Sequence, residues 1–245
     1  MEIVDKLGII PARYASTRFP GKPLATIGGV SMIERVYNQA LKSNLDKVLV
    51  ATDDDRILEC VKGFGGNVVM TNPELPTGTD RCREALALSK VNARLVVNIQ
   101  GDEPFIDPQQ INAIVQLLHG HDVNIATMIS PALTVEEIEN PNRVKVVVEK
   151  TGKALYFSRL PIPFSKNIGD HVSNYAIHLG IYGFKGATLR ELGQLSPSSL
   201  EQSESLEQLR WLENGYEIYT VKTNERTDSV DTPEDLKNLE KKFFL

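Results

Sequence analysis

In the first half of the chain, short apolar runs alternate with amphipathic stretches. The apolar runs predict four strands, at residues 7–10, 47–51, 68–70 and 95–99. The stretches between them predict helices over 31–42, with Ser31 as its cap, over 54–64, closed by a Gly-Gly pair, and from about residue 80. Because strand and helix alternate, we expect an α/β protein with a doubly wound, Rossmann-like and mostly parallel sheet.

The pattern changes after about residue 130. Residues 144–149 and 154–158 are strand-like and are joined by Thr-Gly-Lys, which predicts a hairpin. Later residues predict strands at 178–184 and 216–222 and helices at 200–214 and 233–242. The chain has no internal repeat and no long linker. We therefore expect one domain, residues 1–245, with a mixed sheet and a small β-rich insertion at about 143–185.

Composition narrows the class of protein. The 245 residues are 41% hydrophobic and 24% charged, with a net charge of −5, which is typical of globular proteins and unfavourable for non-specific binding to nucleic acids or anionic membranes. No apolar run approaches the roughly 20 residues of a membrane span. The two cysteines form no CxxC pair, which argues against a disulfide scaffold or a cysteine zinc site. We expect a cytoplasmic protein.

The segment 9–22, here called the phosphate loop, carries Arg13, Arg18 and Lys22 and no acidic residue. It follows the first strand, so it is expected at the carboxyl edge of the sheet, where open α/β folds bind ligands. Its small residues allow backbone N–H groups to approach an anion. The simpler alternative is a solvated basic loop. Neither a dinucleotide-binding fingerprint nor a P-loop is present, which disfavours a nicotinamide dehydrogenase.

Two aspartates are candidates for binding a metal. Asp102, in Gln-Gly-Asp-Glu-Pro, comes just after a central strand, and Gly101 permits a sharp turn there. At that edge its carboxylate suits a hard cation such as Mg²⁺, although aspartate is also common in turns. In Val-Asp-Thr-Pro-Glu-Asp-Leu, a helix start explains Thr232 through Asp235 but leaves Asp231 unexplained.

Four further segments carry polar groups whose simpler explanations are structural. Residues 77–81 begin a helix and are explained by capping. The run 154–159 ends in Arg159, which suits a carboxylate. Period two puts His178, Gly180 and Tyr182 on one face of a strand, with Leu179 and Ile181 toward the core. Glu207 and Arg210 are helix neighbours that a surface ion pair would explain, and Leu206 and Leu209 form the apolar stripe of that helix.

The phosphate loop resembles the N-terminal motif of sugar nucleotidyltransferases, in the R-Y-x-S-T/S-R-x-P-G-K form of the sugar-acid cytidylyltransferases. The strings Q-G-D-E-P, V-D-T-P-E-D-L, A-L-Y-F-S-R, H-L-G-I-Y and L-E-Q-L-R extend the resemblance from residue 8 to about 239. They are similar to the family members that act on 3-deoxy-D-manno-octulosonate (Kdo). Two positions depart from the family pattern: Ser229 stands where glycine is expected, and Ser199 where proline is usual.

The resemblance implies transfer of CMP from CTP to the anomeric hydroxyl of Kdo, giving CMP-Kdo for lipopolysaccharide and pyrophosphate. It implies Mg²⁺ as cofactor, held by Asp102 and Asp231, and a homodimer, for which the strand around Leu179 and Ile181 offers an apolar surface. The general base stays open. The implied catalytic residues are Arg13, Lys22, Asp102 and Asp231. The implied nucleotide contacts are Pro11, Ala12, Arg13, Arg18, Lys22, Thr77, Gly78, Thr79, Arg81 and Gln100. The implied sugar contacts are Arg159, His178, Tyr182, Glu207 and Gln208.

Two alternatives to this function stay open. One is a cytidylyltransferase for another sugar acid, an amino-Kdo or a sialic acid, which would share the phosphate loop. The other is a non-catalytic nucleotide sensor on the same fold, which would need neither a metal pair nor a sugar pocket.

Overall fold

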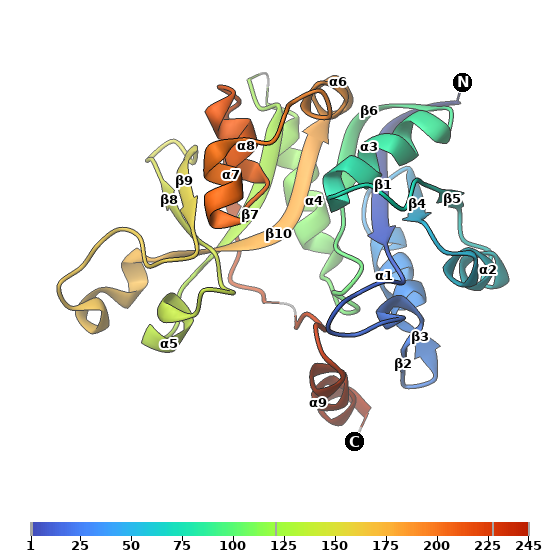
Figure 1. Cartoon of the computed structure of the whole chain (residues 1–245), viewed down its shortest axis with the longest axis horizontal. Helices are drawn as coiled ribbons and strands as arrows, with labels where there is room; N and C mark the ends of the chain where they lie inside the picture. The colour runs from blue at the N-terminus through green and yellow to red at the C-terminus, as the bar shows by residue number, and fades with distance from the viewer. Residues whose placement is uncertain (1, 121, 227, 245) are drawn as a thin grey trace. The chain divides into compact units, whose positions relative to one another are not determined.

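The computed structural model describes residues 2–120, 122–226 and 228–244 (Figure 1). The chain folds into two compact units. Unit 1 comprises Met1–Asn112 and Thr227–Leu245, and unit 2 comprises Ala113–Arg226. The expectation that these residues form a single domain stays a prediction. Within the described residues, no helix is long and apolar enough to cross a membrane.

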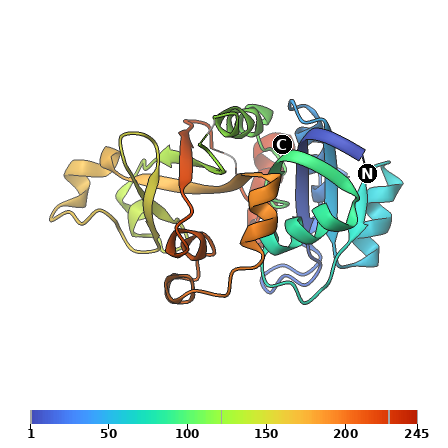
Figure 2. The ribbon, with the colours of Figure 1, turned by 90° about the horizontal axis from the view of Figure 1, so that it is seen from above.

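Unit 1 contains a parallel sheet in the order β6-β1-β4-β5. Its strands are β1 (Glu2–Ala12), β4 (Lys47–Thr52), β5 (Val68–Met70) and β6 (Val91–Asn98). They run side by side in both views (Figures 1 and 2). Ile9 pairs with Leu49 on one side and Asn98 on the other, and Ile9 is fully buried. All four predicted strands of the first half are confirmed, and β1 and β6 are longer than predicted.

The four helices predicted in what is now unit 1 are present near the expected residues, as α1 (Met32–Leu41), α2 (Asp55–Gly63), α3 (Gly78–Leu88) and α9 (Pro233–Phe244). Two further helices were not predicted: the short 3-10 helix η1 (Lys22–Leu24), and α4 (Pro108–Leu118), which begins in unit 1 and continues into unit 2. Asp54 caps α2 by accepting from the Arg56 backbone N–H. Ser31 occupies the cap position of α1, but its side chain makes no capping bond and its hydroxyl lies 3.5 Å from the Cys60 thiol. The prediction is therefore correct for the position of Ser31 and wrong for the capping hydrogen bond.

A small apolar cluster fixes the C-terminal helix of unit 1. The strand β2 (Thr26–Ile27), which forms a hairpin with β3 (Val30–Ser31), contributes to it together with α1, α9 and the segment just before α9. The buried members are Ile27, Met32, Val230 and Leu239, with Phe19, Phe105 and Leu236 packed against them. Val230 is fully buried. Because Val230 immediately precedes Asp231, burial of its side chain determines where the following carboxylate lies.

Unit 2 contains a mixed sheet. Strand β7 (Ile125–Pro131) is central, with β11 (Ile218–Lys222) parallel to it and β10 (Ala176–Lys185) antiparallel. The predicted hairpin is present as β8 (Lys145–Val148) and β9 (Ala154–Ser158), and β8 also pairs with β10. The expected α/β class, with a parallel part, a mixed part and a small hairpin, is confirmed. The sequence pattern did not reveal β7 or α4.

The helix predicted over 200–214 is two helices, which corrects that prediction. They are α7 (Ser199–Glu204) and α8 (Gln208–Glu213); unit 2 also has α5 (Val135–Glu139), α6 (Gly186–Leu192) and the 3-10 segment η2 (Ile168–Asn174). Ser205 ends α7 in the left-handed region, with φ of 52°. This turn lets Leu206, only 6% exposed, enter the core between the two helices. A capping box between Ser198 and Glu201 begins α7 without the usual proline at Ser199.

Candidate active site

A cavity of about 390 Å³ opens at the carboxyl edge of the parallel sheet in unit 1. It brings together the phosphate loop, the start of α3 and the turn after β6. Its lining residues are Pro11, Ala12, Arg13, Ala15, Ser16, Thr17, Arg18, Lys22, Pro23, Gly78, Arg81, Gln100, Gly101 and Asp102. Most of the predicted nucleotide contacts therefore lie around one cavity; Thr77 and Thr79 are not among the residues that line it.

The phosphate loop curls around Tyr14. The Tyr14 carbonyl accepts hydrogen bonds from the backbone N–H groups of Ser16 and Gly21, both at 2.9 Å. Gly21 has φ of 73°, and a Cβ atom there would lie 3.1 Å from the Tyr14 ring, so only glycine fits without strain. The Arg56 guanidinium lies 3.2 Å from the centre of the same ring. These contacts fix the backbone that leads into Lys22.

Gly101 brings the turn after β6 against the end of β1. A Cβ atom at this position would lie 2.9 Å from the Pro11 carbonyl oxygen, which is closer than such atoms approach in proteins. The expected sharp turn thus depends on glycine because of a close backbone approach. As a result, Asp102 lies directly beside the phosphate loop.

The two aspartates singled out in the sequence meet at one lysine. Lys22 Nζ lies 2.9 Å from Asp102 Oδ2 and 3.4 Å from Asp231 Oδ1, and the Arg18 guanidinium lies 3.1 Å from Asp231 Oδ1. The Val230 backbone N–H donates to the Asp102 carbonyl at 2.9 Å, which ties the two carboxylate-bearing segments together. Asp231, which the helix start left unexplained, is thus one half of a paired carboxylate site.

The first turn of α9 holds Asp231 in place through a reciprocal cap. Thr232 Oγ1 accepts from the Asp235 N–H at 3.2 Å, and Asp235 Oδ2 accepts from the N–H groups of Asp231 and Thr232 at 3.0 and 2.8 Å. Burial raises the pKa of Asp235, but the Thr232 hydroxyl and these N–H groups outweigh it, so that pKa lies below its usual value. Ser229 is not among the described residues with positive φ, so its departure from glycine causes no backbone strain.

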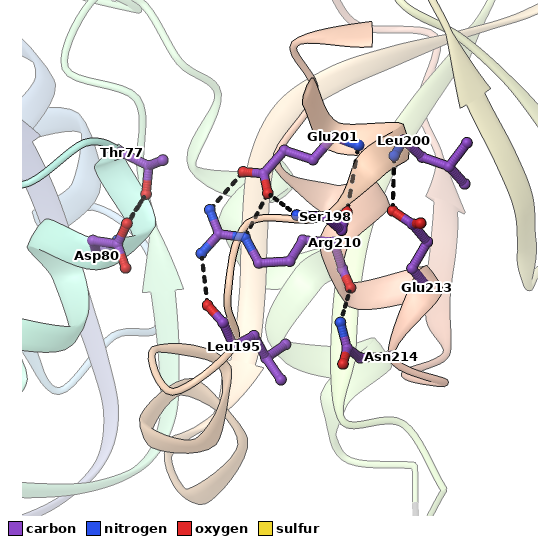
Figure 3. Close-up of polar contacts among 9 residues, drawn as sticks. All are labelled: Thr77, Asp80, Leu195, Ser198, Leu200, Glu201, Arg210, Glu213 and Asn214. Carbon is purple, nitrogen blue, oxygen red and sulfur yellow. Dashed lines mark hydrogen bonds and ion pairs between the residues drawn. The ribbon is translucent and has the colours of Figure 1, made fainter. Parts of the chain in front are cut away.

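From sequence, the residues at the start of α3 are interpreted both as a helix cap and as nucleotide contacts. Thr77 caps the helix, because its Oγ1 accepts from the Asp80 N–H at 3.0 Å. The same hydroxyl donates to the Asp80 carboxylate at 2.8 Å, the bond drawn in Figure 3. Arg81 is 1% exposed, and its guanidinium donates to Thr71 Oγ1 at 2.6 Å and Asp53 Oδ2 at 2.8 Å. Burial lowers the pKa of Arg81, and Asp53 opposes that shift. Arg81 therefore lines the cavity as a fixed side chain, because two of its guanidinium nitrogens are bonded to Thr71 and Asp53.

In unit 2, His178 and Tyr182 lie on the same face of β10, as predicted, with ring centroids 5.2 Å apart. The alternation is interrupted, because the pairing with β7 shifts between Leu179 and Tyr182. Leu179 is consequently only partly buried, while Ile181 is 3% exposed. The prediction that both leucine and isoleucine enter the core is correct for Ile181 and wrong for Leu179, because a bulge changes the register.

The hydrogen bonds of Thr127 define the state of His178. Thr127 Oγ1 donates to the Ile181 carbonyl at 2.8 Å and lies 2.9 Å from His178 Nε2. Since a threonine hydroxyl has one proton, Nε2 is the donor in the second contact. Burial lowers the pKa of His178 to about 3, so the ring is neutral. The Tyr182 hydroxyl is buried without a hydrogen-bond partner among the described residues. Burial and Glu207 raise its pKa, and the neighbouring Thr127 opposes that shift only in part.

Arg159 is bound by backbone carbonyl groups. Its guanidinium donates to the carbonyls of Glu204 at 2.7 Å, Pro141 at 3.0 Å and Ser205 at 3.2 Å. The Glu204 carboxylate in turn accepts from the Arg159 backbone N–H at 2.8 Å. Arg159 thus fixes the turn that leads into the predicted sugar contacts Glu207 and Gln208.

Arg210 pairs with a residue that the sequence pattern did not suggest. Its Nε and NH2 donate to the two carboxylate oxygens of Glu201 at 2.8 and 2.5 Å (Figure 3). Their side chains are 7% and 14% exposed. Arg210 thus forms a buried pair that joins α7 to α8, which the sequence did not suggest, while the pair with Glu207 stays a prediction.

Comparison with known proteins decides the family. The family model described as Cytidylyltransferase matches residues 7–222. The chain belongs to the cytidylyltransferase family. A 3-deoxy-manno-octulosonate cytidylyltransferase of Bacteroides thetaiotaomicron is 50% identical over 96% of both chains. The mitochondrial enzyme of that name from Arabidopsis thaliana is 44% identical over 96% of this chain and 81% of its own. The structure of CMP:2-keto-3-deoxy-manno-octonic acid synthetase complexed with CTP matches with a TM-score of 0.90 and 40% identity, over 97% of both chains.

The donor set of this cytidylyltransferase fits a hard divalent cation. Lys22 Nζ already places a positive charge within 3.4 Å of both Asp102 and Asp231. The described residues contain no group of three or more His, Cys, Asp or Glu that could form a complete protein cage. Mg²⁺ does not need one, because it commonly binds one or two carboxylates together with water and substrate phosphates.

Sequence reasoning missed Asn98 of the cytidylyltransferase. It ends β6, is 2% exposed, and its Oδ1 has no partner among the described residues. A Cβ atom on Gly78 would lie 3.5 Å from Pro11 Cγ and 3.9 Å from Asn98 Nδ2, so the bare Gly78 leaves a narrow gap beside this amide. The signal was a single polar residue inside the apolar run Leu-Val-Val-Asn-Ile.

Proposed function

We propose that this cytidylyltransferase transfers CMP from CTP to the anomeric hydroxyl of Kdo and releases pyrophosphate. The observation that carries the proposal is the meeting of Asp102 and Asp231 at Lys22, on the edge of a cavity lined by the phosphate loop. A nucleotide sensor needs no such carboxylate pair. The relatives named for the same reaction, and the similar structure complexed with CTP, support it.

The cations of the phosphate loop would bind the triphosphate. Arg13, Arg18 and Lys22 line one cavity, and their positive charges would balance the charge that develops on the departing pyrophosphate. Pro11, Ala12, Gly78 and Gln100 line the same cavity and would contact the nucleoside. Thr77, Thr79 and Arg81 would support this part of the pocket from the helix start. Asn98 is a further candidate for contact with the base.

Asp102 and Asp231 would hold Mg²⁺. The chemistry that Mg²⁺ would supply at these two carboxylates is positive charge, which favours ionisation of the sugar hydroxyl and balances negative charge in the transition state. Both side chains are partly open, at 28% and 40% exposure, so water and phosphate oxygens have access to complete the coordination. No protein group is assigned as the general base.

His178, Tyr182, Arg159, Glu207 and Gln208 would bind the sugar acid. A neutral imidazole and a phenol without a partner offer directional hydrogen bonds to hydroxyl groups, at little cost in charge desolvation. Arg159 would act at the sugar carboxylate or through the turn that it holds. We further propose that the protein is a cytoplasmic homodimer that supplies lipopolysaccharide synthesis and binds neither nucleic acid nor membrane.

The test is pyrophosphate release with Mg²⁺, measured for four nucleoside triphosphates against Kdo, an amino-Kdo and a sialic acid. We expect release with CTP and Kdo, abolished by EDTA. Release with CTP and another sugar acid would retain the nucleotide site and replace the sugar. Binding of CTP without release across the panel would contradict catalysis and favour the sensor.

A further inference from the structure

The contact between Lys22 and the carboxylate pair has a consequence for metal binding, which rests on the proposed function. Lys22 Nζ bonds both Asp102 and Asp231, and its side chain is 14% exposed. We propose that Lys22 serves as the internal cation of the nucleotide-free site: it blocks divalent metal from the two carboxylates until a triphosphate draws its ammonium group away.

Geometry makes the lysine and the metal competitors. Mg²⁺ binds carboxylate oxygens at about 2.1 Å, and Lys22 Nζ lies 2.9 Å from Asp102 Oδ2. An ion on that oxygen would therefore stand no more than about 5 Å from the ammonium group. Two cations at this distance repel one another. On the oxygens that Lys22 now contacts, the metal and the ammonium cannot both be held favourably.

Charge balance points the same way. Lys22 and Arg18 bring two positive charges to two carboxylates, so the nucleotide-free pair presents little net charge to attract a metal. Arg18 contributes less, because its side chain is 61% exposed and water screens it. A triphosphate carries more negative charge than one aspartate and would occupy the cavity that Lys22 and Arg18 both line.

The exchange needs only a side-chain movement. Gly21 and η1 fix the backbone on both sides of Lys22, since Gly21 is packed against the Tyr14 ring and Pro23 is buried. The four-carbon lysine stem can turn without moving this loop. Lys22 thereby links two events: its ammonium group goes to the phosphates, and the carboxylates become free for the metal.

The test measures Mn²⁺ binding to nucleotide-free protein from the electron paramagnetic resonance signal of free Mn²⁺. We expect Lys22→Met to bind Mn²⁺ about tenfold more tightly than the wild type. Lys22→Arg keeps the charge and should bind as weakly as the wild type. Lys62→Met is the matched control, because Lys62 is an exposed lysine of unit 1 paired with Glu59. Adding Asp102→Asn to Lys22→Met should remove the gain.

A second measurement, CTP binding by calorimetry in EDTA, should change in the opposite direction to Mn²⁺ binding. Lys22→Met should bind metal-free CTP about tenfold more weakly, because the ammonium group no longer reaches the phosphates. General damage to the fold would not raise the affinity for Mn²⁺ while lowering the affinity for CTP. Unchanged or weaker Mn²⁺ binding by Lys22→Met would overturn the proposal, as would tight Mn²⁺ binding by the nucleotide-free wild type. Neither measurement contains a sugar, so failure of the Kdo assay leaves this result readable.

Discussion

The charged groups of the two units are used differently. In unit 1, Arg18, Lys22, Asp102 and Asp231 contact one another beside a cavity, and all four keep some exposure. In unit 2, the charged groups near the predicted sugar contacts are bound inside the fold, as in the Arg159 contacts to three carbonyl groups. The first arrangement leaves charge available for an ionic ligand. The second uses charge to fix neutral groups in place.

Lys145 is the extreme case in unit 2. It is fully buried, and its ammonium group donates to the carbonyls of Asn140, Arg143 and Arg159 at 2.9, 2.6 and 2.5 Å. Burial and the nearby Arg159 lower its pKa. Three carbonyl groups satisfy an ammonium ion geometrically without neutralising it. Such a group contributes to positioning of the backbone and is not available to a substrate.

The largest expected effect is on turnover, through the carboxylate pair of unit 1. Asp102→Asn and Asp231→Asn should each lower turnover at least about a thousandfold, because the pair would lose a charged metal ligand. Thermal unfolding should change little, since both side chains are partly exposed. Near-normal turnover in either variant would contradict the metal assignment. A large fall in stability would show that these charges serve the fold as well.

The parallel half of the fold and the phosphate loop could be predicted because their signals are local. Strand runs, Gly101 and the Thr232 cap each depend on a few adjacent residues. The division of residues 200–214 into two helices depends on where Leu206 is buried, which is a tertiary fact. The bulge after Leu179 likewise depends on its pairing with β7, and the pattern did not reveal that strand. Lys22 could be predicted as a phosphate ligand, but its contact with both aspartates required their positions in space.

The second prediction tests charge used for the fold in unit 2. Arg210→Met should lower the free energy of unfolding by about 3 kcal/mol, because it leaves Glu201 buried without its partner. Urea denaturation provides the measurement. Lys62→Met removes the exposed Lys62–Glu59 pair and should cost less than about 0.5 kcal/mol. Similar costs for the two variants would contradict the contrast between buried and exposed pairs.

The third prediction concerns the pH dependence of stability in unit 2, where His178 is held neutral. The folded pKa of His178 is about 3, below the usual value of about 6.5, so its contribution is complete above pH 6.5. As pH falls below 6.5, His178 binds a proton in the unfolded chain but stays neutral in the folded chain. Stability should then fall by about 1.4 kcal/mol per pH unit toward pH 3. His178→Gln should flatten the His178 part of this slope, measured by urea denaturation between pH 7 and 5. An unchanged slope would show that His178 is not held neutral.

The smallest expected effect returns to unit 1 and separates support from chemistry. Thr232→Ala removes the hydroxyl that caps Asp235 N–H and should lower stability by about 1 kcal/mol. Because the folded pKa of Asp235 is lowered, its contribution to stability depends on pH. That contribution is present above its ordinary pKa of about 4 and is lost as pH falls through the lower folded value. Asp231 lies directly before this cap, and its N–H donates to Asp235 Oδ2. Its carboxylate should therefore become less well placed, and turnover should fall several-fold without being abolished. Thr232→Ser keeps the hydroxyl and should restore both. If Thr232→Ala matched Asp231→Asn in turnover, the cap and the metal ligand would be one inseparable element, and the division between charge that binds ligand and structure that supports it would not hold in unit 1.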